Sequence, residues 1–145
     1  MNNELQLLNR MFQDATIGML SIDKVLKKLN DEELKKIFKA QFDAYQRIAD
    51  RCDIIALGRD KEVKENGKFK KIKQTAMIYI SLWMDKTPRH IVEMMINGTV
   101  MGIVDTIKAE KDLPPKSEEV KTLLTDFKKM QNEFYEKLKK LLIKV

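Results

Sequence analysis

Residues Leu5 to Leu29, LQLLNRMFQDATIGMLSIDKVLKKL, decide the fold of this chain. Apolar residues recur there at steps that alternate between three and four without a break. This spacing places the apolar side chains on one stripe of an α-helix, as in helical bundles and coiled coils. The stripe consists of Leu5, Leu8, Phe12, Ala15, Met19, Ile22, Leu26 and Leu29. Met11, Gly18 and Val25 widen it, so we expect this helix to contact more than one neighbour.

Similar spacings predict four further helices, and the chain is therefore expected to be all-α. Asn30 to Glu33 is typical of a helix start, and so is Ser117 followed by two glutamates. Thr87 before Pro88 combines a good N-cap with a good first helical residue. The predicted helices span about 3–29, 31–57, 68–85, 88–111 and 117–144 of a single domain, 1–145.

The connections between these helices suggest how they are arranged. Arg59 to Gly67 is the longest polar connection and is expected to be the long crossover of a bundle made of two helical hairpins. The third and fourth helices are expected to form one arm, kinked at Pro88. The predicted fold is an antiparallel four-helix bundle whose third arm carries this kink.

Composition limits the compartment and the class of protein. The chain has 145 residues, of which 43% are hydrophobic and 34% are charged, as in globular proteins. Cys52 is its one cysteine, so an internal disulfide is impossible, and we expect a reducing, cytoplasmic compartment. We expect neither a signal peptide nor a membrane span, because the N-terminus lacks the first pattern and no run of 18 apolar residues occurs.

The net charge of +6 comes mainly from lysine. One basic cluster is Lys68, Lys70, Lys71 and Lys73, which we interpret as a solvated face. The alternative is a weak site for nucleic acid or another anionic surface. Lysine does not make the bidentate contacts with which arginine reads bases and phosphates, so nucleic acid is not the expected partner.

The fourth predicted helix is apolar nearly all round and contains two glycines, Gly98 and Gly102. Each helical glycine costs about 1 kcal/mol relative to alanine, which a close helix approach would offset. Met94, Met95 and Met101 are suited to fill the gaps around such a crossing. The sequence therefore predicts close helix packing here. A small-molecule pocket and a subunit interface on the same face are the alternatives.

Residues with catalytic or metal-binding chemistry are few. His90 is the one histidine of the chain, and Glu93 one turn later could make at most a weak metal contact with it. Cys52 lies on the apolar seam of the second helix, so we expect a buried, inert thiol. The sequence has no glycine-rich phosphate loop, nucleophile elbow or zinc-type cluster. We therefore expect a protein that is not an enzyme and that holds no cofactor.

Two hairpins joined by a crossover resemble the ferritin-like superfamily, and the chain is similar to small bacterial proteins of that group. The resemblance implies the fold. Members with two irons need Glu on two helices and Glu-x-x-His on the other two. The corresponding places here offer only Asp14, Asp43, Glu93 and Glu133, and both histidines are missing. The resemblance thus argues against iron chemistry and leaves a carboxylate-only metal site as an alternative.

Gln41 and Gln131 occupy seam positions on the second and fifth helices, with Tyr45 one turn from Gln41. A buried amide without partners costs about 1–3 kcal/mol. We interpret the two as a polar layer that sets helix register, and the polar part of a ligand pocket is the alternative. The expected function is self-association, as a homo-oligomer, or binding of a protein partner through helix faces.

Overall fold

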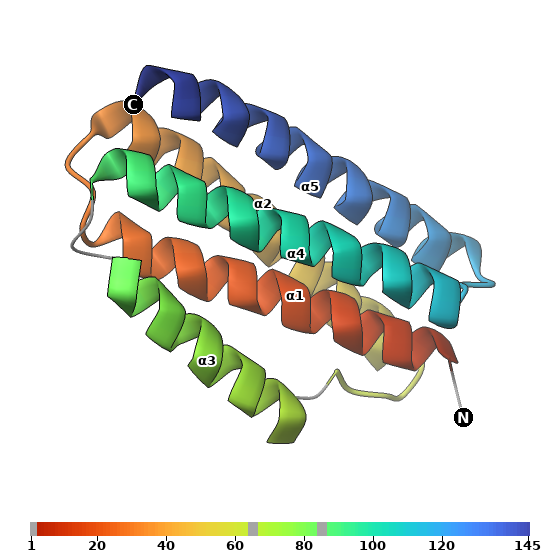
Figure 1. Cartoon of the computed structure of the whole chain (residues 1–145). Coiled ribbons are helices and arrows are strands. Elements are labelled where there is room, and N and C mark those ends of the chain that lie inside the picture. The colour runs from red at the N-terminus through yellow and green to blue at the C-terminus, as the bar shows by residue number, and fades with distance from the viewer. Residues whose placement is uncertain (1–2, 64–66, 84–86) are drawn as a thin grey trace.

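Five α-helices make up the regular structure of this protein in a computed structural model that describes residues 3–63, 67–83 and 87–145. They are α1 (Asn3–Leu26), α2 (Glu32–Leu57), α3 (Gly67–Trp83), α4 (Pro88–Asp112) and α5 (Glu118–Lys144). Consecutive helices run in alternating directions (Figure 1). The prediction of an all-α chain is confirmed. The first helix ends at Leu26 rather than Leu29, and the expected end of the third at 85 lies outside the described residues.

Three of the helices begin where side-chain caps were predicted. The Asp31 carboxylate accepts a hydrogen bond from the Leu34 N–H, at 3.0 Å. The hydroxyls of Thr87 and Ser117 accept in the same way from N–H groups in the first turns of α4 and α5. Each of the three caps has extended backbone, which stops the helix from continuing backwards.

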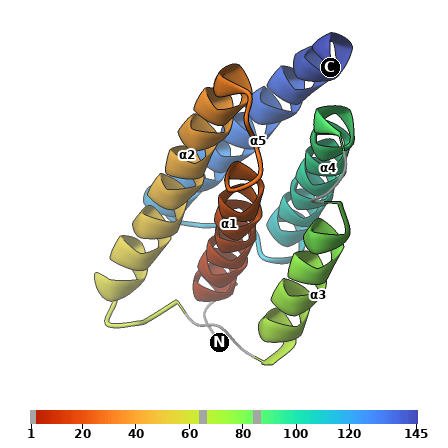
Figure 2. The ribbon, with the colours of Figure 1, turned by 90° about the vertical axis from the view of Figure 1, so that its left-hand side faces the viewer.

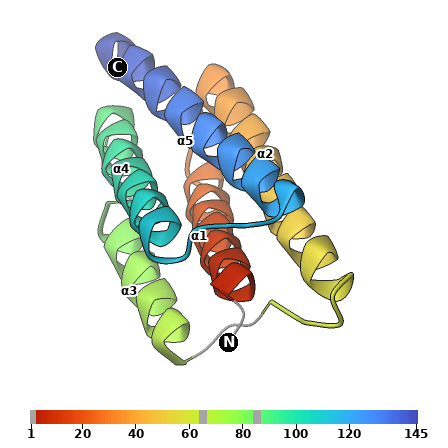
Figure 3. The ribbon, with the colours of Figure 1, turned by 90° about the vertical axis from the view of Figure 1, so that its right-hand side faces the viewer.

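Two antiparallel hairpins, α1 with α2 and α4 with α5, form most of the bundle. They join where α2 packs on α5 and α1 packs on α4 (Figures 2 and 3). α1 contacts every other helix, which explains its wide apolar stripe. Its completely buried side chains follow a seam shifted from the predicted one: Leu7, Leu8, Met11, Ala15, Ile22 and Val25.

α3 takes a different place from the one predicted. It packs along the outside of α1 and runs antiparallel to α4 (Figures 1 and 2). The prediction of a single arm kinked at Pro88 is therefore wrong. α2 ends at one end of the bundle and α4 begins at the other, so the connection must cover the length of the bundle, and α3 does so. Its Ile72, Ile78 and Leu82 are exposed, which is why it adds little to the core.

Aromatic pairs bind the two hairpins together in the core. Phe38 of α2 meets Phe134 of α5 edge-on, with ring centroids 6.1 Å apart. Tyr45 and Phe127 repeat this arrangement two turns along, at 6.5 Å. Such pairs add about 0.5–1.5 kcal/mol each beyond the free energy that comes from the area they bury.

Within residues 3–63, 67–83 and 87–145, no helix is both long enough and apolar enough to cross a membrane.

Candidate functional site

A carboxyl pair, partly buried, joins α1 to α4. Asp14 is hydrogen-bonded to Asp105, and the Arg10 guanidinium lies 2.5 Å from Asp105 Oδ1. Burial raises the pKa of Asp14 well above its usual value, and the hydrogen bond and charge of Asp105 raise it further. Burial also acts to raise the pKa of Asp105, but hydrogen bonds from Asp14 and Arg10 outweigh it and lower that pKa. Asp14 therefore keeps its proton more readily and donates it to Asp105.

Tyr45 of α2 lies beside this pair and covers Gly18 of α1. A Cβ atom at Gly18 would stand 2.6 Å from two ring carbons of Tyr45, closer than real Cβ contacts come. Burial raises the pKa of the Tyr45 hydroxyl to about 12, although its hydrogen bond with Gln41 acts in the opposite direction. Tyr45 is therefore a neutral, hydrogen-bonded core residue and is not poised as a general base.

The two seam glutamines are both buried, as predicted, but they bond to different partners. Gln41 contacts Tyr45 and donates to the Met130 sulfur of α5. The Gln131 amide donates to the Thr106 hydroxyl of α4 at 3.0 Å. Its Oε1 atom is buried and accepts no hydrogen bond from the described residues. The glutamines thus connect α2 to α5 and α5 to α4, and their role in fixing register stays a prediction.

The four carboxylates considered for a metal site do not come together. Asp14 bonds to Asp105, whereas Asp43 is exposed. Glu93 faces Arg89 and His90 on its own helix, and Glu133 is exposed near Lys129. Among the described residues, no three His, Cys, Asp or Glu side chains are grouped so that they could hold a metal ion. The alternative of a carboxylate-only metal site at these four residues is therefore wrong. On α5, Phe134 takes the core position, and this turns the neighbouring Glu133 outward.

Close packing was expected at Gly98 and occurs instead at Gly18. A Cβ atom at Gly98 would meet nothing within 4 Å, so this glycine marks no close approach between helices of one chain. A Cβ at Gly102 would lie 3.4 Å from the Gln131 amide nitrogen, which is a tight contact. Met94 and Met95 are buried, whereas Met101 is 72% exposed. The position of Gly18 on the buried side of α1 was the signal that could have identified it.

The outer side of α4 is apolar and exposed, although the helix is apolar nearly all round. Val100, Val104 and Ile107 are 38%, 43% and 55% exposed. Together with Met101 they form what we call the outer face of α4. The buried side of the same helix packs on α1 and α5. Contiguous exposed apolar surface of this kind is typical of a protein interaction site.

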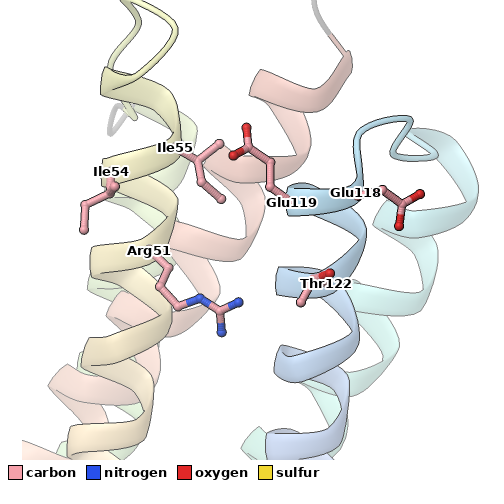
Figure 4. A pocket seen from close by; sticks show the side chains of 6 residues that line it. All are labelled: Arg51, Ile54, Ile55, Glu118, Glu119 and Thr122. Atoms are coloured by element: carbon pink, nitrogen blue, oxygen red, sulfur yellow. The ribbon is translucent and has the colours of Figure 1, made fainter.

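A shallow groove of about 530 Å³ lies between the end of α2 and the start of α5 (Figure 4). Ile54 and Ile55 supply its apolar wall, and Arg51, Glu118, Glu119 and Thr122 complete the lining. The Arg51 guanidinium is bonded to Asp126 at 2.9 Å, and Glu119 is bonded to Arg59 at 2.7 Å. The charges at its rim are thus engaged within the chain, which favours an apolar contact over recognition of a charged ligand.

An ionic cluster at the same end of the bundle was not predicted. The Glu4 carboxylate accepts hydrogen bonds from the backbone N–H groups of Lys116 and Ser117, at 2.6 and 2.7 Å. Arg59 lies 2.6 Å from the same carboxylate. Burial acts to raise the pKa of Glu4, but these hydrogen bonds lower it to about 2. Glu4 therefore ties the start of α1 to the start of α5, a long-range contact with no sequence signature.

The lysine cluster lies on α3, where Lys68, Lys70 and Lys71 are exposed. The Lys73 ammonium lies 5.5 Å from the centroid of the Phe69 ring, and Phe69 is 1% exposed. A buried ring offers no platform on which a base could stack. The interpretation of this cluster as a solvated face stays a prediction.

Cys52 is completely buried, as predicted, and burial raises the pKa of its thiol to about 12. A thiol that stays protonated is a poor nucleophile.

Compared with known proteins, the chain matches no family model, no curated protein and no solved structure.

Proposed function

We propose that this chain acts by association through a helix face, with a second copy of itself as the partner, and not by catalysis. The exposed apolar outer face of α4 is the observation that carries the proposal. Burying apolar surface contributes about 25 cal/mol per Å². In a single chain, much of this free energy is not gained by four exposed side chains, those of Val100, Met101, Val104 and Ile107. Association would bury them and recover it.

The groups that could carry chemistry support a structural role. Asp14 is engaged with Asp105, and Tyr45 with Gln41. Cys52 is buried as a neutral thiol. Asp14 and Tyr45 thus have hydrogen-bond partners within the chain, and none of the three groups lines the groove between α2 and α5.

For the fold, we propose a ferritin-like bundle that works without a di-metal centre. Its support is the path of the chain, in which two antiparallel hairpins are joined by a segment that runs the length of the bundle through α3. The polar side chains between its helices bond to one another: Asp14 of α1 to Asp105 of α4, and Gln131 of α5 to Thr106 of α4.

The mass of the purified protein in solution tests the function. Light scattering after size exclusion, over a wide range of concentration, is expected to give a mass above the 17.0 kDa of one chain. A mass of one chain at every concentration would overturn self-association. Elemental analysis of the same samples tests the rival: stoichiometric iron that is lost in Asp14→Ala would restore the metalloprotein hypothesis.

A further inference from the structure

The outer face of α4 has a regular spacing of its own. Starting at Glu93, its positions follow steps of four and three, which is the spacing of a coiled-coil seam. The seam consists of Glu93, Asn97, Val100, Val104, Ile107 and Lys111. It is separate from the side of α4 that packs in the bundle, where Val92, Met95, Thr99, Thr106 and Ala109 are buried. α4 therefore carries two seams, and the apolar residues of the outer one stay exposed among the residues that the structure describes.

The two ends of the outer seam carry opposite charges. Glu93 lies near the start of α4, and Lys111 lies near its end. Between them the seam holds Asn97 and three apolar residues, with no charge. Glu93 is a third exposed and already lies 3.4 Å from Arg89 on the same helix, while Lys111 is exposed. This distribution makes the face electrically asymmetric along its length.

A second copy of the same helix complements this asymmetry in one direction only. In a parallel pair, Glu93 would face Glu93 and Lys111 would face Lys111. In an antiparallel pair centred on Gly102, Glu93 of each copy faces Lys111 of the other, and Val100 faces Val104. Opposite charges that face each other attract, and like charges repel. Antiparallel coiled coils use the same alternation of facing positions.

We propose that two copies of this chain pair antiparallel through the outer face of α4, with Val100 of each copy against Val104 of the other. This inference rests on the proposed function and specifies its interface. Asn97 lies across from Ile107 of the second copy, and a single seam asparagine is a feature that fixes register in coiled coils. Met101, 72% exposed, lies beside the seam and extends the apolar contact.

A matched pair of substitutions tests the location of the interface. Val104→Glu introduces a charge at the centre of the seam and is expected to convert the dimer to a single chain. Ile78→Glu on α3 changes an equally apolar, exposed residue and is expected to leave the dimer intact. Both side chains are exposed, so both variants are expected to keep the helical circular dichroism of the wild type. A dimer lost in Ile78→Glu and kept in Val104→Glu would overturn the inference while leaving self-association standing.

Disulfide cross-linking tests the direction of the pairing. Val100→Cys and Val104→Cys proteins are prepared separately, mixed under reducing conditions and then oxidised. Antiparallel pairing predicts a covalent dimer in the mixture and little in either protein alone, because position 100 faces position 104. Parallel pairing predicts the reverse, with a covalent dimer in each protein alone. The native Cys52 is buried and does not compete.

Charge reversal provides an independent check on the register. Glu93→Lys alone places two like charges opposite each other at both ends of the antiparallel pair. The dimer of this variant is therefore expected to be weaker and to dissociate at a higher protein concentration than the wild type. Adding Lys111→Glu restores opposite charges and is expected to restore the wild-type dissociation constant. A double variant that dissociates more readily than either single variant would contradict the register. A wild-type protein that never exceeds the mass of one chain would overturn both this inference and the proposed function.

Discussion

The ring of Tyr45 on α2 lies against the backbone of Gly18 on α1, so closely that any side chain at position 18 would overlap it. The ring cannot easily move aside, because Tyr45 is 7% exposed and packs edge-on against Phe127. This contact sets how near α1 and α2 approach at the level of the Asp14–Asp105 pair. It therefore fixes the spacing of the first hairpin there.

Gly18→Ala is expected to destabilise the protein by about 1–3 kcal/mol, because overpacking forces a well-packed core to shift. Gly98→Ala is the matched control: it has open space around it and is expected to stabilise α4 by up to about 1 kcal/mol. Urea denaturation of the two variants measures both effects. A stabilised Gly18→Ala protein would show that the ring of Tyr45 yields freely.

The Glu4 cluster predicts a loss of stability in acid. The pKa of Glu4 is lowered from 4.5 to about 2 in the folded protein, so the stability that it contributes is complete above pH 4.5 and is lost as the pH falls toward 2. Glu4→Gln cannot gain this contribution and is expected to be less stable at neutral pH by about 1–3 kcal/mol. The difference from wild type is expected to shrink as the pH falls. Denaturant unfolding at several pH values measures it.

Two outcomes would contradict this account of Glu4. One is a difference between Glu4→Gln and wild type that stays constant across the acid range. The other is an equal loss in Glu118→Gln, the control, since the Glu118 carboxylate is exposed and pairs with Lys121 on its own helix.

Asp14→Asn is expected to be well tolerated, because an amide can donate to Asp105 as the protonated carboxyl does. The pKa of Asp14 is raised by burial, so the wild type loses stability as the pH rises from the unfolded value toward the folded one. The Asn variant has no such loss, and its advantage over wild type is expected to grow from acid to neutral pH. Paired urea titrations at pH 5 and pH 8 test this. A strongly destabilised Asn variant at both pH values would indicate an ionised Asp14.

The lysine cluster of α3 is expected to bind nucleic acid only weakly and without sequence preference. Lys68, Lys70 and Lys71 are exposed point charges on a helix whose Phe69 is buried, so binding would come from counterion release. Fluorescence anisotropy with a short duplex is expected to show binding at low salt that disappears by about 0.2 M. A complex that persists at higher salt, or that prefers one sequence, would contradict the interpretation of this face as merely solvated.

Local patterns were enough to predict the helices and their starts. An N-cap such as Asp31, Thr87 or Ser117 acts within one turn, so its effect is readable from neighbouring residues. Positions on the seams of α2 and α5 were also predictable, because each of those helices has one strongly dominant apolar side. Burial of Cys52, Gln41 and Gln131 follows from their positions on those seams.

Tertiary structure alone decided how the helices are placed and which distant residues meet. α3 and α4 each have apolar residues on several sides, so their periodicity could not show which side faces the core; packing left the outer face of α4 exposed and placed α3 outside α1. Asp14 with Asp105, Glu4 with Ser117 and Gly18 with Tyr45 are contacts between different helices or their ends. Their geometry depends on the rotation and height of whole helices, which neighbouring residues in the sequence do not determine.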